Sequence, residues 1–238
     1  MSVAMKRTAV VLLASGLSRR YGRKDKMLAE LGGKLLVEYA GDVVAKLNTL
    51  TRIAVCSAEP KDVSENLNKH FVVAINKAPK AGLGHSIAVG AKVAMQFKPD
   101  AMLFVMADMP FIEAAMLREL VSRLGGRDGA DIVHSGGADG VRSPTAFGAA
   151  CFAALTKLDG DDGAKSIVKS GAFRVAGIGA AAPLLVDVDT RHDLKAAEEQ
   201  LAIRKRHRAT TKPRPVKAKP KRRLPRSRFA ATLRAAQR

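Results

Sequence analysis

The sequence predicts one α/β domain in which helices cover both faces of a mostly parallel sheet, a three-layer α/β/α arrangement. Short apolar runs rich in Val, Ile and Leu alternate with segments whose apolar residues recur at helical spacing, and such alternation is typical of parallel sheets. Hydrophobic residues make up 47% of the 238 residues, enough for one sizeable core. Acidic residues disappear after residue 202. We therefore assign the domain to residues 1–202 and a basic tail to residues 203–238.

Each expected strand is a run of apolar and β-branched residues that is too short for a typical helix. The six runs are residues 8–14, 53–57, 71–75, 101–106, 131–134 and 184–188. Longer segments between them carry apolar residues every three to four positions, which predicts helices at residues 35–47, 86–97 and 114–124. Ligands of such sheets bind outside the carboxyl ends of the strands, where the strand order reverses. The first strand and the strand at 101–106 should therefore end on one edge of the sheet.

The net charge of +19 belongs mainly to the tail, because residues 203–238 contain 15 Lys and Arg and no Asp or Glu. This segment also contains several prolines and little that could be buried, so we expect it to be disordered. Its cations could bind the phosphates of a nucleic acid, or an acidic protein partner. A solvated extension is the simpler interpretation, because only Phe229 offers a ring on which a base could stack.

The two cysteines and the apolar runs favour a cytoplasmic protein. Cys56 and Cys151 are far apart and lack metal-binding spacing, so we expect both to be reduced and buried. The first residues, MSVAMKR, lead into an expected strand without the apolar region of a signal peptide. No apolar run is long enough to cross a bilayer.

The stretch LASGLSRRYGRKDK, residues 13–26, follows the first expected strand and predicts a phosphate-binding loop. Small residues let backbone amides approach a ligand closely, and the hydroxyl and cations that follow can bind a polyphosphate. The stretch contains neither G-x-x-x-x-G-K-[ST] nor G-x-G-x-x-G. The alternative is a basic turn that only joins a strand to a helix. The candidate nucleotide ligands are Leu13, Ala14, Ser15, Gly16, Ser18, Arg19 and Lys26, with Arg20 as a further cation.

A second feature is Asp108 in MLFVMADMP, where an apolar strand ends. A carboxylate at a strand end can hold Mg²⁺, which prefers one or two carboxylates together with phosphate oxygens and water. The alternative is that Asp108 caps a helix beginning near Pro110. The neighbouring phosphate-binding loop favours the metal interpretation.

A third feature is LLVDVDTRHDL, residues 184–194. Side chains alternate along a strand, so Asp187 and Asp189 would point to opposite faces and only one would readily face the site. Thr190, followed by Asp193 three residues later, predicts a capped helix start.

These motifs together resemble the nucleotidyltransferases that carry an LAAG-x-S-x-R-x-G-x(n)-K loop. Within them the chain is most similar to the molybdenum cofactor cytidylyltransferases and their guanylyltransferase relatives, although Ser15 departs from both branches. The resemblance extends to N-x(5)-G-x-x-x-S-x-x-x-G at residues 76–90 and D-[IV]-D-T-x-x-D-L at residues 187–194, and it spans residues 8–201. It implies a single Rossmann-like nucleotidyltransferase domain.

The resemblance also implies roles for individual residues. Asn76, Gly82 and Ser86 would contribute to nucleotide recognition, whereas the residues alone allow a loop with a capping serine. Asp108 and Asp189 would be the metal ligands, and the choice between Asp187 and Asp189 stays open.

Residues 142–168 match a further family segment, which would form the wall for the acceptor substrate. Ser143 stands where many members have His, so this chain departs from the family pattern at that position. The alternative is that the segment has only a structural role, as a β-bulge followed by a helix.

The implied reaction joins CTP to the phosphate of the molybdenum cofactor and releases pyrophosphate, with Arg19, Lys26 and Asp108 as catalytic residues and Mg²⁺ as the cofactor. GTP is the alternative nucleotide, and a sugar phosphate or polyol phosphate is the alternative acceptor. The molybdoenzyme that receives the product, or a chaperone, is the corresponding protein partner.

Overall fold

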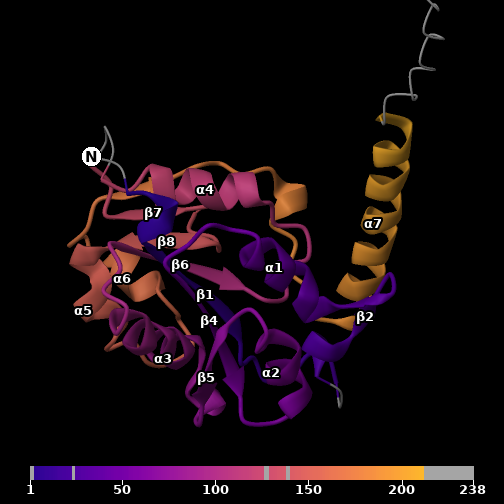
Figure 1. Ribbon diagram of the computed structural model, residues 1–238, viewed down its shortest axis with the longest axis horizontal. Helices are drawn as coiled ribbons and strands as arrows, with labels where there is room; N and C mark the ends of the chain where they lie inside the picture. The colour runs from indigo at the N-terminus through magenta and orange to yellow at the C-terminus, as the bar shows by residue number, and fades with distance from the viewer. Residues whose placement is uncertain (1–2, 23–24, 126–128, 138–139, 212–238) are drawn as a thin grey trace, which may run out of the picture. The chain divides into compact units, whose positions relative to one another are not determined.

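The computed structural model describes residues 3–22, 25–125, 129–137 and 140–211. The chain divides into two units, Met1–Ala202 and Ile203–Arg238, and the first unit contains the sheet. The sheet has seven strands in the order β5-β4-β1-β6-β8-β7-β9 (Figure 1). Their bounds are β1 Thr8–Ala14, β4 Thr51–Ser57, β5 Val72–Asn76, β6 Ala101–Met106, β7 Ile132–His134, β8 Thr145–Gly148 and β9 Val175–Gly177. A separate hairpin consists of β2 Glu30–Leu31 and β3 Lys34–Leu35.

The central strand is β1, which pairs in parallel with β4 and with β6. All seven of its residues are buried, as expected for a strand covered on both faces. From β1 the chain adds β4 and β5 on one side and then returns to add β6 on the other. The strand order therefore reverses at β1, and Leu13 lies opposite Met106 at the carboxyl ends of β1 and β6.

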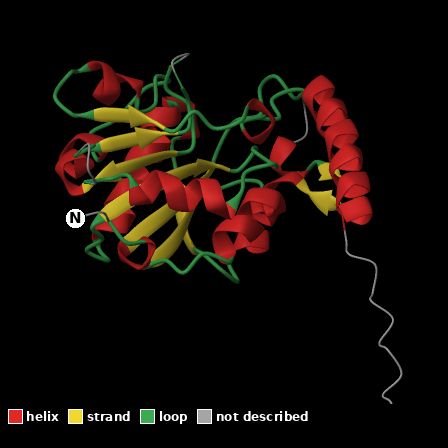
Figure 2. Cartoon of the chain, turned by 90° about the horizontal axis from the view of Figure 1, so that it is seen from above, coloured by secondary structure: helices red, strands yellow, loops and turns green. Residues whose placement is uncertain are grey.

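Helices form a layer on each face of the sheet, as Figures 1 and 2 show. Val10 and Leu12 point into a core shared with α1, α2 and α4, while Val11 and Leu13 point into a core shared with α3, α5 and α6. The helix bounds are α1 Leu36–Ala45, α2 Lys61–Leu67, α3 Leu83–Met95, α4 Ala114–Ser122, α5 Phe152–Leu155, α6 Lys165–Lys169 and α7 Arg191–Thr211. The predicted three-layer α/β fold is confirmed.

Glycine permits the close packing of α3 on the central strands. A Cβ added to Gly90 would lie 2.5 Å from Val11 Cγ1 and 3.0 Å from Val55 Cγ2, both in the core. We expect Gly90→Ala to destabilise the fold by about 1–2 kcal/mol, since overpacking outweighs the better helix propensity of alanine. Urea unfolding measures this. Gly41→Ala in α1 is the matched control, because its Cβ would meet only the end of the Leu67 side chain, at 3.1 Å. Equal stability of the two variants would contradict the packing argument.

Five of the six predicted strands are present, and β1 and β6 have the predicted bounds. The strand predicted at residues 184–188 is wrong: a 3₁₀ turn, Ala182–Leu184, is followed by irregular backbone. Leu185 is buried in the core beneath the sheet, whereas Val188 packs outside the sheet with Leu31, Phe111 and Ala197. An apolar run indicates that its residues are buried, but not which elements cover them. Here the hairpin and α7 cover Val188.

The predicted helices are present with shifted ends, whereas α2, the hairpin, β8 and β9 were not predicted. Residues 203–211, assigned to a disordered tail from their composition, belong to α7. The remainder of that predicted tail lies outside the described residues. No described helix combines the length and apolarity needed to span a membrane. Cys56 and Cys151 are buried and unpaired as predicted, and burial raises the pKa of each thiol to about 12.

Candidate active site

The loop after β1 presents backbone amides to solvent. Gly16, Leu17 and Arg19 are exposed, and the amides of residues 16–19 donate to no acceptor in the described part of the chain. A Cβ added to Gly16 would meet nothing within 4 Å, so there is open space above this part of the backbone. Exposed amides beside cations form a suitable site for phosphate.

Ser18 supports this loop from within. Its φ of 51° is in the left-handed region, an unusual conformation for a residue other than glycine. The Ser18 hydroxyl donates to Asp25 Oδ1 at 3.1 Å and accepts from the Lys26 amide at 3.1 Å. The Met27 amide also donates to Asp25 Oδ1, at 2.9 Å. The predicted nucleotide ligand Ser18 thus lines the cleft, but its hydroxyl is used to connect the two ends of the loop.

Lys26 joins the loop to two aspartates that are distant in sequence. Its Nζ lies 2.5 Å from Asp108 Oδ2 and 2.8 Å from Asp189 Oδ1. Lys26 and Asp108 are buried, at 6% and 4% exposure. On the outer side, Arg20 Nη2 lies 2.8 Å from Asp189 Oδ2. Lys26, which was predicted to neutralise phosphate, therefore meets both predicted metal ligands at one place.

The electrostatics of this cluster favour positive charge. Burial is the largest single influence on Lys26 and lowers its pKa, but the charges and hydrogen bonds of Asp108 and Asp189 together raise that pKa above its ordinary value. Burial raises the pKa of Asp108, Lys26 opposes this, and Asp187 and Asp189 add to it. Asp187 therefore adds negative charge beside the ion pairs that Lys26 and Arg20 form with Asp108 and Asp189.

The segment that carries Asp187 and Asp189 is positioned by hydrogen bonds at both ends. The Val188 amide donates to the Asp108 carbonyl at 3.0 Å. Asp193 accepts from the amides of Asp189 and Thr190 at 3.1 and 2.8 Å, and its own amide donates to Thr190 Oγ1 at 3.2 Å. The predicted capped helix start is thus confirmed, and it fixes the backbone of Asp189.

Because this segment is not a strand, the expectation that Asp187 and Asp189 face opposite directions is wrong: both line the same cleft. Asp187 is exposed and Asp189 is half-buried. Of these two aspartates, only Asp189 forms ion pairs with Lys26 and Arg20 in the described part of the chain.

On the other side of the loop, three buried polar side chains form a connected group. The Ser86 hydroxyl accepts from Ser15 Oγ at 2.9 Å and from Asn76 Nδ2 at 3.1 Å, and it donates to the Gly82 carbonyl at 3.3 Å. Ser57 Oγ donates to the Ser15 carbonyl at 3.2 Å. This group attaches the loop to the beginning of α3. Asn76 is fully buried and does not line the cleft, so it supports the wall from behind.

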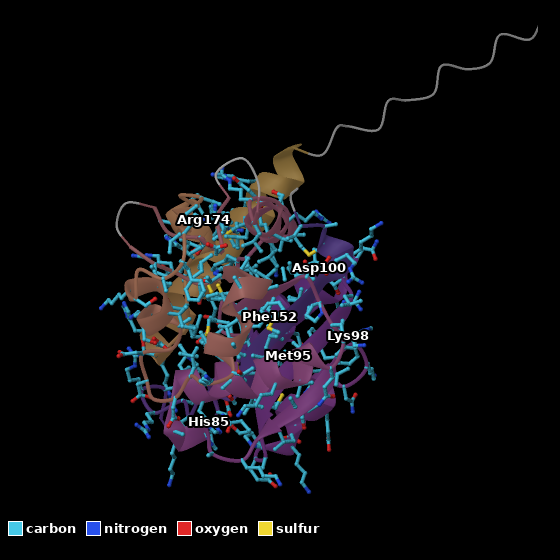
Figure 3. The ribbon with its side chains drawn as sticks, turned by 90° about the vertical axis from the view of Figure 1, so that its left-hand side faces the viewer. His85, Met95, Lys98, Asp100, Phe152 and Arg174 are labelled. Carbon is cyan, nitrogen blue, oxygen red and sulfur yellow. The ribbon has the colours of Figure 1, made fainter. Side chains whose placement is uncertain are left out.

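Gly82 and Gly84 allow a second loop to approach the start of α3. A Cβ added to Gly82, where φ is +95°, would lie 2.4 Å from the Gly160 carbonyl carbon, and a Cβ on Gly84 would lie 2.5 Å from the Asp159 oxygen. The Gly84 amide donates to the Gly160 carbonyl at 2.8 Å. Close contact with the backbone of residues 159–160 is therefore sufficient to explain why residues 82 and 84 are glycines. His85, labelled in Figure 3, lies 3.7 Å from Asp159 through Nδ1 and Oδ1.

These elements surround a cleft of about 530 Å³ at the carboxyl ends of β1 and β6. Its lining includes the predicted residues Leu13, Ser15, Gly16, Ser18, Arg19, Lys26, Gly82, Ser86, Asp108 and Asp189. Ala14 and Asn76 are buried outside the lining. From the segment predicted as the acceptor wall, Asp161 and Lys165 reach the cleft, whereas β8 lies within the sheet.

Sequence reasoning did not select Lys80, which lines the cleft. It named Arg20 only as a further cation of the loop, and it gave Asp161 and Lys165 no role beyond the acceptor wall. A signal for Arg20 existed, since the arginine of the loop motif LAAG-x-S-x-R falls on residue 20 rather than on residue 19. Arg19 is exposed and forms no ion pair with a described residue.

The residues present fit a divalent cation. Asp108 Oδ1 is buried and has no hydrogen-bond partner among the described residues, and a buried acceptor without a partner is costly. No group of three or more His, Cys, Asp or Glu in the described ranges forms a ready-made metal site. A divalent cation held at these carboxylates would need further oxygen ligands, such as water or a phosphate. The alternative role of Asp108 as a helix cap is wrong, because α4 begins at Ala114 after Glu113.

A mostly parallel sheet with exposed backbone amides and carboxylates at its point of reversal is typical of nucleotide-binding α/β proteins. The chain belongs to the family with the MobA-like NTP transferase domain, whose model matches residues 10–175.

Among curated proteins, the bifunctional protein GlmU of Solibacter usitatus is 26% identical over 125 residues, which are 52% of this chain and 27% of GlmU. The chain thus spans about a quarter of the length of the curated relatives it matches.

Solved structures share the fold. The homologue of Mycobacterium tuberculosis Rv0371c from Mycobacterium sp. strain JC1 superposes with a TM-score of 0.72 at 24% identity, covering 84% of this chain and 99% of the other. Rv0371c of M. tuberculosis H37Rv in complex with manganese gives 0.64 at 23% identity, with 81% and 97% covered. Molybdopterin-guanine dinucleotide biosynthesis protein A of Archaeoglobus fulgidus gives 0.61 at 18% identity, with 82% and 99% covered.

Proposed function

We propose that this protein is a Mg²⁺-dependent nucleotidyltransferase that transfers the cytidylyl group of CTP to the phosphate of the molybdenum cofactor and releases pyrophosphate. The observation that supports it most is the meeting of Lys26 with Asp108 and Asp189 beside the free amides of residues 16–19. Family membership supports the transferase class. The name of the A. fulgidus structure supports a molybdopterin acceptor.

The cleft provides binding groups for each part of a nucleoside triphosphate. The base would lie against the backbone of residues 13–16, which the Ser15–Ser86–Asn76 group holds in place. The phosphates would receive hydrogen bonds from the amides of residues 16–19 and charge from Arg19 and Lys26. Asp108 and Asp189 would hold Mg²⁺, which supplies charge neutralisation at the phosphates.

The acceptor would enter from the side of Asp161 and Lys165, which belong to a different segment from the loop. Its phosphate is already a nucleophile, so the protein's task is to place it in line with the leaving pyrophosphate and to neutralise charge. This accounts for a site built from cations and carboxylates without a dedicated general base. Lys165 has the charge required to bind a phosphate-bearing acceptor.

Pyrophosphate release, measured with each of the four nucleoside triphosphates, Mg²⁺ and molybdenum cofactor, tests this proposal. We expect release with CTP and cofactor together and none when the cofactor is omitted. Release with GTP instead would show that GTP rather than CTP is the nucleotide substrate. Release only with sugar or polyol phosphates would show that the acceptor is not the molybdenum cofactor. No release with any pairing would overturn the proposal. Repeating the assay with a chain ending at Ala202 tests whether the basic residues that follow contribute to transfer or serve a nucleic-acid or molybdoenzyme partner.

A further inference from the structure

The position of Lys26 suggests a role that goes beyond neutralising phosphate. Its ammonium lies 2.5 Å from Asp108 and 2.8 Å from Asp189, between the two carboxylates that would hold a divalent cation. Among the described residues Lys26 pairs with no other carboxylate. In this arrangement the ammonium is the counter-ion of both carboxylates.

We propose that Lys26 is an exchangeable counter-ion, which keeps divalent cations weakly bound until a nucleoside triphosphate draws the ammonium away from the two aspartates. The inference rests on the proposed function, because it takes Asp108 and Asp189 as the metal ligands. Metal and nucleotide then enter together, and the nucleotide-free protein does not retain the metal.

Burial strengthens the competition between the Lys26 ammonium and a divalent cation for the two carboxylates. Lys26 and Asp108 are both almost completely enclosed, so their charges are poorly screened by water and salt. A cation that enters must neutralise the same two carboxylates, and the ammonium opposes it until another anion receives Lys26. The phosphate-binding loop offers such a place, because Lys26 is the last residue of that loop and the free amides of residues 16–19 line the same cleft.

The carboxylate pair also shows why exchange is possible. Asp108 Oδ2 accepts from Lys26, whereas the buried Oδ1 has no partner in the described structure. The ammonium therefore leaves one oxygen of Asp108 unsatisfied, although a cation that coordinates the carboxylate more fully would satisfy it. Arg20 neutralises the outer oxygen of Asp189 and is 74% exposed, so it can move without a large cost in packing.

Direct binding of Mn²⁺ to the full-length protein without nucleotide, followed by electron paramagnetic resonance, tests the inference. We expect Lys26→Met to bind Mn²⁺ at least about tenfold more tightly than the wild type, because one competing charge is removed at contact distance. Lys26→Arg keeps the charge and should stay close to the wild type. Lys80→Met removes a lysine of the same cleft that pairs with neither aspartate and should change the affinity by less than about twofold.

Thermal unfolding supplies a second readout, because a ligand that binds the native state raises Tm. Mn²⁺ should raise the Tm of Lys26→Met more than that of the wild type. Lys26→Gln, which can still donate to both carboxylates, replaces Lys26→Met if the latter does not fold.

The outcomes separate this inference from the proposed function. If Lys26→Met binds Mn²⁺ no more tightly than the wild type while Asp108→Asn weakens binding, the metal site stands and the counter-ion role is wrong. An equal gain in Mn²⁺ affinity in Lys80→Met would also overturn the counter-ion role, since any loss of positive charge in the cleft would then have the same effect. If Lys26→Met gains affinity and the added change Asp108→Asn does not reverse it, the metal binds elsewhere and both proposals fail.

Discussion

Asp108→Asn is expected to lower the rate of nucleotidyl transfer by at least about a thousandfold while the protein stays folded. The amide has nearly the shape of the carboxylate but cannot hold a divalent cation with the same charge. Lys26 keeps its ion pair with Asp189, so the cleft retains a counter-ion. Pyrophosphate release under saturating CTP, acceptor and Mg²⁺ measures the loss, and circular dichroism checks the fold.

Asp100→Asn is the matched control for this change. Asp100 pairs with Arg7 at 2.9 Å in an exposed position outside the cleft, so transfer should be unchanged. Removing metal from the wild type with a chelator should reproduce the loss, and excess Mg²⁺ should restore activity. Substantial transfer by Asp108→Asn would contradict the assignment of the metal ligand.

Lys26→Met is expected to reduce kcat by about 100- to 1000-fold, because a preorganised charge that stabilises the developing pyrophosphate is lost, worth about 3–4 kcal/mol at the transition state. The same variant is expected to bind Mn²⁺ more tightly, so metal affinity and rate should change in opposite directions. Steady-state kinetics at saturating metal separates the two effects.

Lys34→Met is the control for the loss of a lysine, since Lys34 pairs with Asp42 outside the cleft. It should leave kcat unchanged. A Lys26→Met enzyme that is fully active at saturating Mg²⁺ would show that the ammonium acts only on metal binding and contributes nothing to transfer.

The central strands and the chemical character of the loop at residues 13–26 were predictable because their signals are local. An uninterrupted apolar run such as residues 8–14 is compatible with a strand covered on both faces. A turn of small residues followed by cations can be recognised from its own sequence, without knowledge of what it contacts. The end of the strand at Asp108 was predictable for the same reason, since Pro110 interrupts the pattern. The capped start of α7 at Thr190 and Asp193 also lies within four residues.

The position of Asp187 and Asp189 was not predictable, because it depends on contacts far along the chain. Their alternation suggested opposite faces of a strand, but the Val188 amide bonds to the Asp108 carbonyl and Val188 packs on the hairpin and α7. The close packing at Gly82 was not predictable for the same reason, since the loop at Gly160 that approaches it is distant in sequence.

The sequence by itself determined the alternating α/β order, the chemical character of the loop at residues 13–26 and the acidic end of β6. Only the tertiary structure decided that Lys26, Asp108 and Asp189 share one ion-pair cluster, that Ser18 and Asn76 support the walls from within, and that Arg20 rather than Arg19 pairs with an aspartate. The physical reason is the distance along the chain over which each signal acts. The spacing of apolar residues and the residue types of a turn are local properties of a few residues, whereas ion pairs between buried groups depend on which strands the fold places side by side.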